Sequence, residues 1–414
     1  MRIAHFVQRY PPALGGSEAY FARLSKFLCG LGSYVKVFTT AANDLEAFWS
    51  HRGRRCRPGR DIQNGVTVHR YPLLRFPGQR QVLRLLSLLP ARAWQLMTVS
   101  CNPVCPRMLW DACRGTERFD LVHATAVPYG WPLYCGLVLA RRLRTPFVVT
   151  PFLHLGDPDD PNDRIRRAYT SPAFLWLLRA ADRVVVQTNV ERDALLRLNF
   201  PEKQIVLQGL GVDRESCTGG DRAGTRARWG IAADDVVVGH LANNSIEKGT
   251  VDLLRAAALA WDAGHRFRVV LAGPEMPNFR RFWEHFPRRD AVVRLGVLSD
   301  QAKRDFFAAI DIFAMPSRSD SFGLVFLEAW ANGVPNVAYR AGGVPGVIRA
   351  EVDGLLIRCG DHHALAAAIV RLCNDPESRR RFGACGEQRL ERDFNWQEKL
   401  ELVNSLYQEL AHTK

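Results

Sequence analysis

Short apolar runs alternate with amphipathic stretches along most of this chain, and this alternation constrains the fold more than any other feature of the sequence. Runs such as Ile3–Val7 and Arg183–Gln187 are typical of buried strands, whereas Ser17–Leu31 has apolar residues at helical spacing. Strands that alternate with amphipathic helices predict parallel sheets covered by helices on both faces. The alternation occurs in two series, with strands predicted at 3–7, 34–39, 121–123, 147–150 and 183–187, and then at 236–239, 267–271, 291–295, 312–315, 336–339 and 355–357.

Two such series predict an α/β protein with two doubly wound, Rossmann-like domains, and the length of 414 residues agrees with two domains. We place the first domain at residues 1–208, the second at 209–390 and a C-terminal segment at 391–414. The boundary falls at the glycine-containing stretch Gln208–Asp213. Within the first domain, Thr188–Glu191 has the pattern of a capping box and predicts the start of a helix.

The positive charge of the chain is confined to its first half. The chain has 56 Lys and Arg residues against 42 Asp and Glu residues, a formal net charge of +14. Residues 1–200 contain 28 of the basic and 14 of the acidic residues, which leaves 28 of each in the remainder. A surplus on one of two domains predicts that this domain faces something anionic.

Composition and segment lengths exclude several classes of protein. With 47% hydrophobic and 24% charged residues, the chain is globular rather than disordered or collagen-like. No stretch approaches the roughly 20 uninterrupted apolar residues of a membrane-spanning helix, and Met1–Val7 lacks the longer apolar core of a secretory signal. The ten cysteines have no framework spacing, so we expect reduced thiols in a cytosolic protein. Cys101, Cys105 and Cys113 lack the CxxC pairs or histidine partners of a zinc site.

Open parallel sheets bind ligands on the loops that follow their strands, and four such loops contain chemically useful residues. The first, Pro11–Glu18, brings Gly15 and Gly16 to a helix N-terminus, where the backbone can approach an anionic group closely. It matches neither the GxGxxG nor the Walker pattern, and a tight turn capped by Ser17 is the alternative. The second loop places His154 directly after a strand, where an ordinary loop histidine is the alternative.

The third and fourth loops belong to the second series. Asn243–Gly249 places Lys248 ahead of a helix, where its charge can meet a phosphate, although an ordinary exposed lysine is the alternative. The fourth loop contains Asp320 and leads into a helix with Glu328 on its second turn. The two carboxylates offer acceptors for hydroxyl groups, and the backbone N–H groups near 322–324 offer donors for phosphate, a layout that suits a nucleotide sugar. A carboxylate that stabilises a nearby loop is the alternative.

These loops belong to a series of motifs that follow one another along nearly the whole chain. The motifs are Pro11–Glu18, Phe152–His154, Gly211–Asp213, Glu247–Gly249, Pro316–Ala329, Gly333–Pro335, Ala341–Pro345, Asp353–Leu356 and Phe394–Trp396. In order and spacing they resemble the family-four retaining glycosyltransferases of the GT-B fold. The resemblance implies transfer of a sugar from a nucleoside-diphosphate donor with retained anomeric configuration. It also implies a second domain that binds the donor, a first domain that meets the acceptor, and a final helix that crosses back onto the first domain.

The resemblance further implies roles for individual residues. His154, Lys248 and Asp320 are expected to be catalytic: His154 aligns the sugar, Lys248 neutralises the departing diphosphate, and Asp320 holds sugar hydroxyls. The residues expected to bind the donor are Gly15, Gly16, Asn243, Lys248, Leu298 at the base, Ser321, Phe322, Gly323, Leu324, and Glu328 at the ribose. Because a lysine and a helix dipole can stabilise the diphosphate, no metal or other cofactor is expected.

Two positions depart from the family pattern. Asp320 stands where the family usually has a glutamate, which alters the contacts to the hydroxyls of the donor sugar. Asn243 stands five residues before Lys248, where the family usually has an arginine. His240 is the candidate to supply the missing positive charge.

Because the second half is electrically balanced, the donor does not account for the surplus charge. The expected partners are therefore a nucleotide sugar, a glycan or lipid-linked acceptor in cell-surface polysaccharide or glycolipid synthesis, and an anionic membrane. Gln79–Met97, with Arg80, Arg84 and Arg92 among apolar residues, resembles an interfacial helix, and a helix buried against the first sheet is the alternative. We expect a cytoplasmic enzyme that works at the inner face of the cytoplasmic membrane.

Two other functions remain open. One is a sugar-nucleotide epimerase or phosphorylase on the same fold. The other is nucleic-acid binding, which the net charge suggests. Residues 51–60 contain five arginines, but no aromatic residues are interleaved with them, and no RNA-recognition, KH or zinc-finger pattern occurs. Nucleic acid is therefore not an expected partner.

Overall fold

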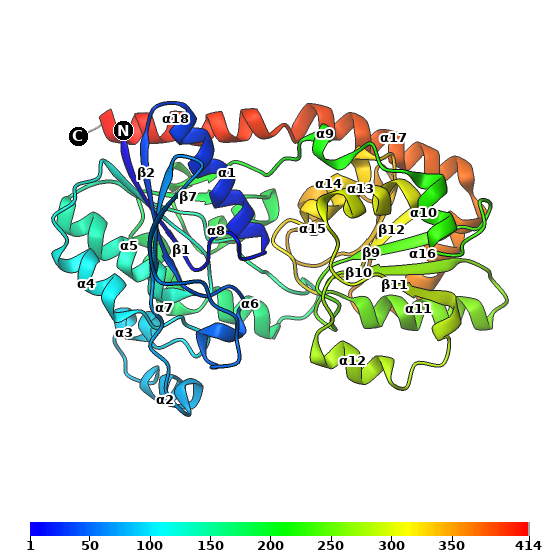
Figure 1. Cartoon of the computed structure of the whole chain (residues 1–414), viewed down its shortest axis with the longest axis horizontal. Helices are drawn as coiled ribbons and strands as arrows, with labels where there is room; N and C mark the ends of the chain where they lie inside the picture. The colour runs from blue at the N-terminus through cyan, green and yellow to red at the C-terminus, as the bar shows by residue number, and fades with distance from the viewer. Residues whose placement is uncertain (413–414) are drawn as a thin grey trace.

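The computed structural model describes residues 1–412 and contains two α/β units that lie side by side, each built around its own sheet (Figure 1). The predicted fold class is confirmed. The last two residues of the segment 391–414 lie outside the described part of the chain. No helix within residues 1–412 is long and apolar enough to cross a membrane.

The first sheet has eight strands in the order β3-β4-β2-β1-β5-β6-β7-β8. Neighbouring strands are parallel except β3 and β4. The strand order reverses between β1 and β5, so the loops after these two strands flank the point where doubly wound sheets bind ligands. The strands are β1 Arg2–Val7, β2 Tyr34–Thr40, β3 Gly59–Gln63, β4 Val66–Tyr71, β5 Leu121–Ala124, β6 Phe147–Val149, β7 Arg183–Val186 and β8 Ile205–Leu207.

The second sheet has six strands in the order β11-β10-β9-β12-β13-β14, and all of its neighbours are parallel. Its order reverses between β9 and β12, which places the loops at 242–249 and 316–323 beside each other. The strands are β9 Val237–Leu241, β10 Arg268–Ala272, β11 Val292–Arg294, β12 Ile312–Met315, β13 Asn336–Tyr339 and β14 Gly354–Ile357.

Helices connect the strands in both units. Those of the first unit are α1 Gly16–Gly30, α2 Gln79–Leu86, α3 Arg92–Met97, α4 Pro106–Arg114, α5 Gly130–Leu143, α6 Arg164–Tyr169, α7 Pro172–Arg179 and α8 Asn189–Arg197. Those that follow are α9 Arg214–Cys217, α10 Arg222–Arg228, α11 Thr250–Asp262, α12 Pro277–Trp283, α13 Asp300–Ala309, α14 Leu324–Ala331, α15 Val344–Val347, α16 His362–Asn374, α17 Pro376–Asp393 and α18 Trp396–His412. The central strands are buried along their whole length, as in β5 and β12, because helices cover both faces of each sheet.

The antiparallel hairpin of β3 and β4 is the main departure from the predicted parallel sheets. It turns at Asn64 and Gly65, whose φ angles of 51° and 81° are both positive. An Asn-Gly pair between two alternating runs is a strong hairpin signal, because these residues adopt positive φ at low cost. This signal lies in the sequence, but the surrounding region between residues 40 and 120 lacks the strand–helix periodicity that defines the rest of the chain.

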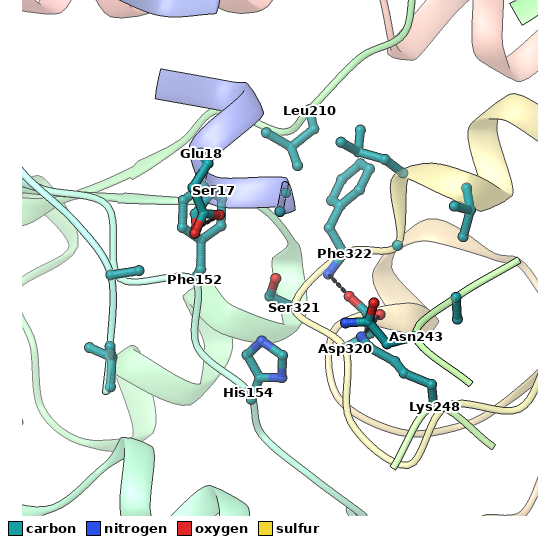
Figure 2. A pocket seen from close by; sticks show the side chains of 18 of the residues that line it. Ser17, Glu18, Phe152, His154, Leu210, Asn243, Lys248, Asp320, Ser321 and Phe322 are labelled. Atoms are coloured by element: carbon teal, nitrogen blue, oxygen red, sulfur yellow. Dashed lines mark hydrogen bonds and ion pairs between the residues drawn. The ribbon is translucent and has the colours of Figure 1, made fainter. Parts of the chain in front are cut away.

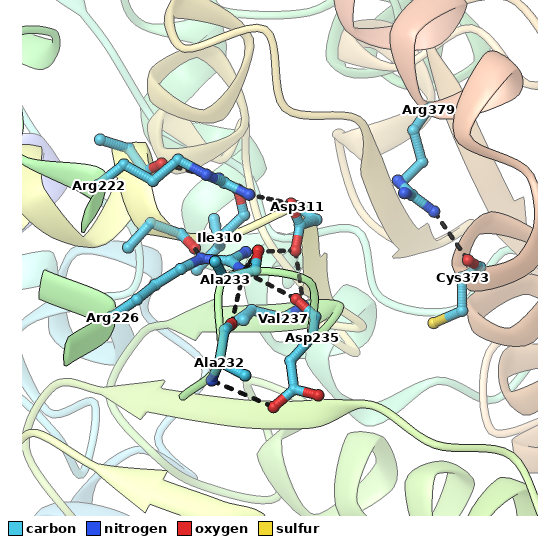
Figure 3. A network of polar contacts seen from close by, with 12 residues as sticks. Arg222, Arg226, Ala232, Ala233, Asp235, Val237, Ile310, Asp311, Cys373 and Arg379 are labelled. Carbon is cyan, nitrogen blue, oxygen red and sulfur yellow. Dashed lines mark hydrogen bonds and ion pairs between the residues drawn. The ribbon is translucent and has the colours of Figure 1, made fainter. Parts of the chain in front are cut away.

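A polar network fixes the start of the second sheet, at the end of its strands remote from the loops at 242–249 and 316–323 (Figure 3). The carboxylate of Asp311 pairs with Arg222 and with the buried Arg226, each at 2.6 Å. It also accepts the N–H of Val237 at 2.8 Å, and Arg226 donates to the carbonyl of Asp235 at 2.8 Å. This network joins the beginnings of β9 and β12, the two strands at the reversal of strand order, to helix α10.

The C-terminal helix α18 returns to the first unit, and its last described residue, His412, lines the same surface hollow as Met1 (Figure 1). The hydroxyl of Tyr407 lies 3.2 Å from Nε2 of His5 on β1 and 2.5 Å from Nδ1 of His123 on β5. All three side chains are fully buried, and burial lowers the pKa of His5 to about 3, so both imidazoles are neutral. Helix α18 is therefore attached to the two strands at the reversal point of the first sheet.

Candidate active site

A cavity of about 430 Å³ lies between the two units, lined by the loops that follow the reversal points of both sheets (Figure 2). Ten of the residues predicted to act at the site line this cavity: Gly15, Gly16, His154, Asn243, Lys248, Asp320, Ser321, Phe322, Gly323 and Leu324. They come from positions more than 300 residues apart in the chain. The parallel topology brings them together, because the carboxyl ends of the strands in each sheet lie at one edge.

Lys248 and Asp320 form an ion pair in the wall contributed by the second unit. Nζ of Lys248 lies 2.6 Å from Oδ2 of Asp320. Burial alone would raise the pKa of Asp320, but the adjacent ammonium group holds this pKa below its ordinary value. The carboxylate is therefore ionised, and the charge of Lys248 is balanced within the site.

Helix α14 points its N-terminus at the cavity. Gly323 precedes the helix with a φ of 88°, a conformation that favours glycine, and a Cβ there would lie 2.6 Å from the ring of Phe326. The N–H of Phe322 approaches Oδ1 of Asp320 at 3.4 Å. Free N–H groups at the start of a helix carry a partial positive charge and bind anions such as phosphate.

On the opposite wall, the turn between β1 and α1 presents two glycines for different reasons. A Cβ on Gly15 would lie 2.2 Å from Oε2 of Glu18, whereas a Cβ on Gly16 would meet nothing within 4 Å. Gly15 is thus required by its own neighbours, and Gly16 leaves room in the cavity.

The partner of Glu18 is a residue that the motif search did not single out. Glu18 forms a buried ion pair with Arg9 at 2.7 Å, and Gln8 donates to the same carboxylate at 3.1 Å. Gln8 and Arg9 both line the cavity. The sequence did not single them out, because they follow β1 directly and belong to no motif. Their contact with Glu18 and their place in the cavity wall appear only in the structure.

His154 enters the cavity from the loop after β6. Its ring lies 4.9 Å from that of Tyr169, and in Figure 2 it lies between the first unit and Asp320. Burial, followed by the positive charge of Lys248, lowers the pKa of His154 to about 4. At neutral pH the imidazole is uncharged, so it acts through hydrogen bonds rather than through charge.

Glu191 holds the loop that carries His154. The predicted capping box is confirmed in part, since the Thr188 hydroxyl accepts the N–H of Glu191 at 3.2 Å. The Glu191 carboxylate instead reaches across to the neighbouring loop and accepts the N–H of Leu153 at 2.5 Å and the N–H of Gln187 at 2.6 Å. Burial raises the pKa of Glu191 to about 7, although the backbone donors oppose this shift.

Two predicted donor residues, Glu328 and Leu298, do not line the cavity, and their roles remain predictions. Glu328 lies on the second turn of α14 as expected, is 9% exposed, and pairs with Lys303 at 2.5 Å. Its second carboxylate oxygen is buried without a hydrogen-bond partner among the described residues. Burial raises the pKa of Glu328, and Lys303 opposes the shift. Leu298 is partly buried against the apolar core.

The expectation that His240 supplies a second positive charge is wrong. His240 is fully buried, with Nδ1 2.8 Å from the carbonyl of Ala314 and Nε2 2.9 Å from the hydroxyl of Thr250. Burial lowers its pKa to about 4, so the ring is neutral and joins the ends of β9 and β12. Asn243 lines the cavity in the place of the usual arginine, and Lys248 is the cation on this wall.

Comparison with known proteins agrees with this architecture. Residues 15–211 match the family of glycosyl transferase 4-like domains, and residues 221–389 match the family of glycosyl transferases group 1. The chain is 29% identical to a D-inositol 3-phosphate glycosyltransferase of Saccharomonospora viridis over 95% of this chain and 89% of the relative. It is 27% identical to the protein of the same name in Thermobifida fusca over 96% of this chain and 89% of the relative.

Solved structures share the fold of the whole chain. Sucrose-phosphate synthase from Thermosynechococcus elongatus superposes with a TM-score of 0.75 at 22% identity, with 100% of both chains covered. HepE of Anabaena in complex with UDP-glucose superposes with a TM-score of 0.71 at 19% identity, with 99% of this chain and 100% of the other covered. The two family matches, with the shared architecture, show that this chain is an enzyme that belongs to the group 1 glycosyltransferases of the GT-B fold.

Proposed function

We propose that this glycosyltransferase moves a sugar from a nucleoside-diphosphate donor, most simply a uridine diphosphate sugar, to an acceptor hydroxyl with retention of the anomeric configuration. The observation that carries the proposal is the composition of the two cavity walls. Lys248 and the N-terminus of α14 offer positive charge on one wall, opposite Gly16 and the neutral His154 on the other. The complexes of HepE with UDP and with UDP-glucose support a uridine nucleotide on this fold.

The chemistry follows from the change of charge during transfer. As the bond between the sugar and the diphosphate breaks, positive charge grows on the anomeric carbon and negative charge on the leaving phosphate. A lysine and helix N–H groups placed before the reaction stabilise that phosphate more in the transition state than in the ground state. Each such donor contributes on the order of 10²- to 10³-fold in rate.

The ion pair between Lys248 and Asp320 must rearrange when the donor binds. The diphosphate competes for the Lys248 ammonium, and Asp320 is then free to accept hydroxyl groups of the donor sugar. Glu328 offers its unpartnered carboxylate oxygen to the ribose hydroxyls, which would give that buried atom the hydrogen bond it lacks. In this proposal Lys248 binds the diphosphate, and the carboxylates of Asp320 and Glu328 accept hydrogen bonds from hydroxyl groups and do not bind a metal ion.

The first unit supplies the acceptor wall. Because Arg9 is neutralised by Glu18, the wall near Gly15 has no net charge, and Oε1 of Gln8 is buried without a partner among the described residues. A neutral wall with a free hydrogen-bond acceptor suits sugar hydroxyls at the reacting end of the acceptor. We propose a glycan or lipid-linked acceptor, as in cell-surface polysaccharide or glycolipid synthesis. The relatives from Saccharomonospora viridis and Thermobifida fusca are named D-inositol 3-phosphate glycosyltransferases, so a small phosphorylated polyol is the alternative acceptor.

A thermal-shift screen of UDP-, GDP- and ADP-sugars tests the donor assignment. A matching nucleotide sugar should raise the melting temperature of the wild-type protein, and Lys248→Ala and Glu328→Ala should each reduce the shift. The assignment is wrong if no nucleotide sugar stabilises the wild type, or if both variants respond as the wild type does.

A second assay separates transfer from other chemistry on the same fold. The stabilising nucleotide sugar is incubated with and without a panel of sugar acceptors, and products are followed by NMR, which reports the anomeric configuration of a new glycosidic bond. Transfer predicts a retained configuration in the presence of acceptor. Formation of an epimeric nucleotide sugar without acceptor would favour an epimerase instead.

A further inference from the structure

A helix on the first unit exposes apolar side chains next to unpaired arginines. Helix α2 and the turn after it expose Val82, Leu85, Leu88 and Leu89, with Leu85 and Leu88 67% and 75% exposed. Residues 51–100 contain ten arginines and a single acidic residue, Asp61. We call the combination the arginine–leucine surface, which comprises Val82, Leu85, Leu88, Leu89, Arg55, Arg75, Arg80 and Arg84.

The arginine–leucine surface is anchored from beneath rather than free to fold inward. The inner side of α2 packs on the protein through Leu83, and Gln79 donates to the carbonyl of Phe48 at 3.2 Å. The alternative expectation of a helix buried against the first sheet is therefore wrong for α2. Helix α3 buries Leu96, but its main contacts are with the helices α5 and α7 and not with the sheet.

The arginines gather around the loop that supports α2. Arg80 lies over the ring of Trp49 at 5.0 Å, and Arg75 donates to the carbonyl of Ser50 at 3.0 Å. Burial, and then the charge of Arg55, lowers the pKa of Arg75. Within residues 1–412 no carboxylate forms an ion pair with these arginines or with Arg84. Arg55, Arg80 and Arg84 are exposed, whereas Arg75 is partly buried and its Nε is enclosed.

This combination selects one kind of occupant. A second copy of the chain would bring arginines against arginines, and nucleic acid would not use the exposed leucines. An anionic membrane satisfies both, because lipid phosphates pair with arginines while apolar side chains enter the acyl boundary. Both parts of the surface are then used at once.

The surface also adjoins the acceptor side of the cavity. Leu45 lines the cavity, and Phe48 packs on the cavity residue Tyr129 with the ring centroids 5.3 Å apart. The next residue, Trp49, stacks under the guanidinium group of Arg80. In Figure 1, α2 projects from the first unit on the side away from α18. We propose that the arginine–leucine surface docks the enzyme on an anionic phospholipid membrane and so presents a lipid-linked acceptor to the cavity. This inference rests on the proposed transfer to such an acceptor.

Vesicle flotation tests the inference on the full chain. The wild-type protein is mixed at low salt with vesicles of phosphatidylcholine alone or of phosphatidylcholine with phosphatidylglycerol. Two variants probe the surface, Leu85→Ser/Leu88→Ser/Leu89→Ser and Arg80→Gln/Arg84→Gln. Matched controls change the same number of exposed residues elsewhere, Leu31→Ser/Leu259→Ser/Leu402→Ser and Arg266→Gln/Arg380→Gln.

We expect the wild type to float with the phosphatidylglycerol vesicles, and both surface variants to bind at least tenfold more weakly than either control. High salt should release the protein, because the arginine contacts are screened. The inference is overturned if the wild type stays in the dense fraction, if the surface variants float like the controls, or if the leucine variant instead abolishes a concentration-dependent dimer. The surface variants should bind UDP as the wild type does. A loss of vesicle binding with unchanged UDP binding then tests the membrane surface independently of the donor site.

Discussion

Nζ of Lys248 lies 2.6 Å from Oδ2 of Asp320, although the two residues belong to loops after different strands of the second sheet. The cation expected to receive the leaving diphosphate is therefore already engaged before the nucleotide arrives. The carboxylate both competes for the lysine and serves as an acceptor for the donor sugar. Binding of free UDP tests only the competition for Lys248, because UDP has no sugar. Transfer from a nucleotide sugar tests both roles of Asp320.

Replacement of Asp320 by asparagine should separate them. Asp320→Asn frees the Lys248 ammonium, so we expect UDP to bind about tenfold more tightly, which corresponds to about 1.4 kcal/mol. Transfer from the nucleotide sugar should slow, because the acceptor for the sugar hydroxyls is weakened. Calorimetry measures the first effect and initial rates the second; weaker UDP binding in this variant would contradict the competition.

The protonation state of His154 predicts a flat response to pH. Because its pKa is lowered to about 4, His154 is neutral from pH 5 upward, and the transfer rate should show no step near pH 6.5 that depends on this residue. His154→Gln, which keeps a hydrogen-bonding side chain, should retain more activity than His154→Ala. A step near pH 6.5 that disappears in His154→Gln would show that the imidazole acts as a charged group.

The same shift affects stability. Between pH 4 and 6.5 the unfolded chain binds a proton at His154 that the folded protein does not, so the free energy of unfolding should rise with pH across this window and level off above it. The buried His240 has the same lowered pKa and adds to this effect. Urea titrations at several pH values test this: from pH 6.5 down to pH 4 the free energy of unfolding of the wild type should fall more steeply than that of His154→Gln.

Gly15 and Gly16 should respond differently to the same substitution. Gly15→Ala drives a methyl group into the carboxylate of Glu18, so we expect a loss of stability of about 1 to 3 kcal/mol and loss of activity. Gly16→Ala meets no neighbour and occupies the first position of a helix, so its melting temperature should be maintained while the KM for the donor rises. Equal melting temperatures for the two variants would contradict the steric account.

Glu191 is predicted to be a positioning residue for the loop that carries His154. Glu191→Ala leaves the N–H groups of Leu153 and Gln187 buried without an acceptor, which costs about 1 to 3 kcal/mol for each group. Glu191→Gln keeps one of the two bonds and should restore part of the activity. The informative readout is kcat, since a misplaced His154 slows transfer more than it weakens nucleotide binding.

The pH dependence of Glu191 has the opposite sign to that of His154. With a pKa of about 7 in the folded protein, Glu191 keeps its proton over a range where the unfolded chain has lost it. Its contribution to stability should therefore decline as pH rises from about 4.5 to 7 and stay constant above that range. The free energy of unfolding of the wild type should therefore fall relative to that of Glu191→Gln between about pH 4.5 and 7. A difference between the two proteins that stays constant across this range would contradict the prediction.

The sequence predicted the cavity because its motifs follow strands, and parallel sheets collect the ends of their strands at one edge. Lys248 and Asp320 could be assigned to one site on that rule alone. The contact between Glu191 and Leu153 could not be predicted. A glutamate in a capping box is expected to accept a hydrogen bond from the start of its own helix, and its contact with Leu153 depends on how the neighbouring loop folds. The buried state of His240 likewise depends on Ala314 of β12, which lies 74 residues further along the chain.

The exposed side of α2 could not be predicted from the sequence either. Leu83 and Leu85 flank Arg84, and the sequence does not say which of the two leucines is buried. In the structure Leu83 is buried, Leu85 faces solvent, and Gln79 ties the helix to the carbonyl of Phe48. The hairpin at Asn64 and Gly65 could be read from its turn signal, but its antiparallel strand lies outside the periodic pattern that predicted the sheets.

Calorimetric titration of UDP tests the central claim, that the cavity between the two units binds a nucleoside diphosphate through Lys248. The wild type, Lys248→Met and the surface control Leu31→Ser are compared at the same salt concentration. We predict that UDP binds the wild type and the control equally, and binds Lys248→Met at least tenfold more weakly. Equal affinity of UDP for the wild type and Lys248→Met would contradict the account.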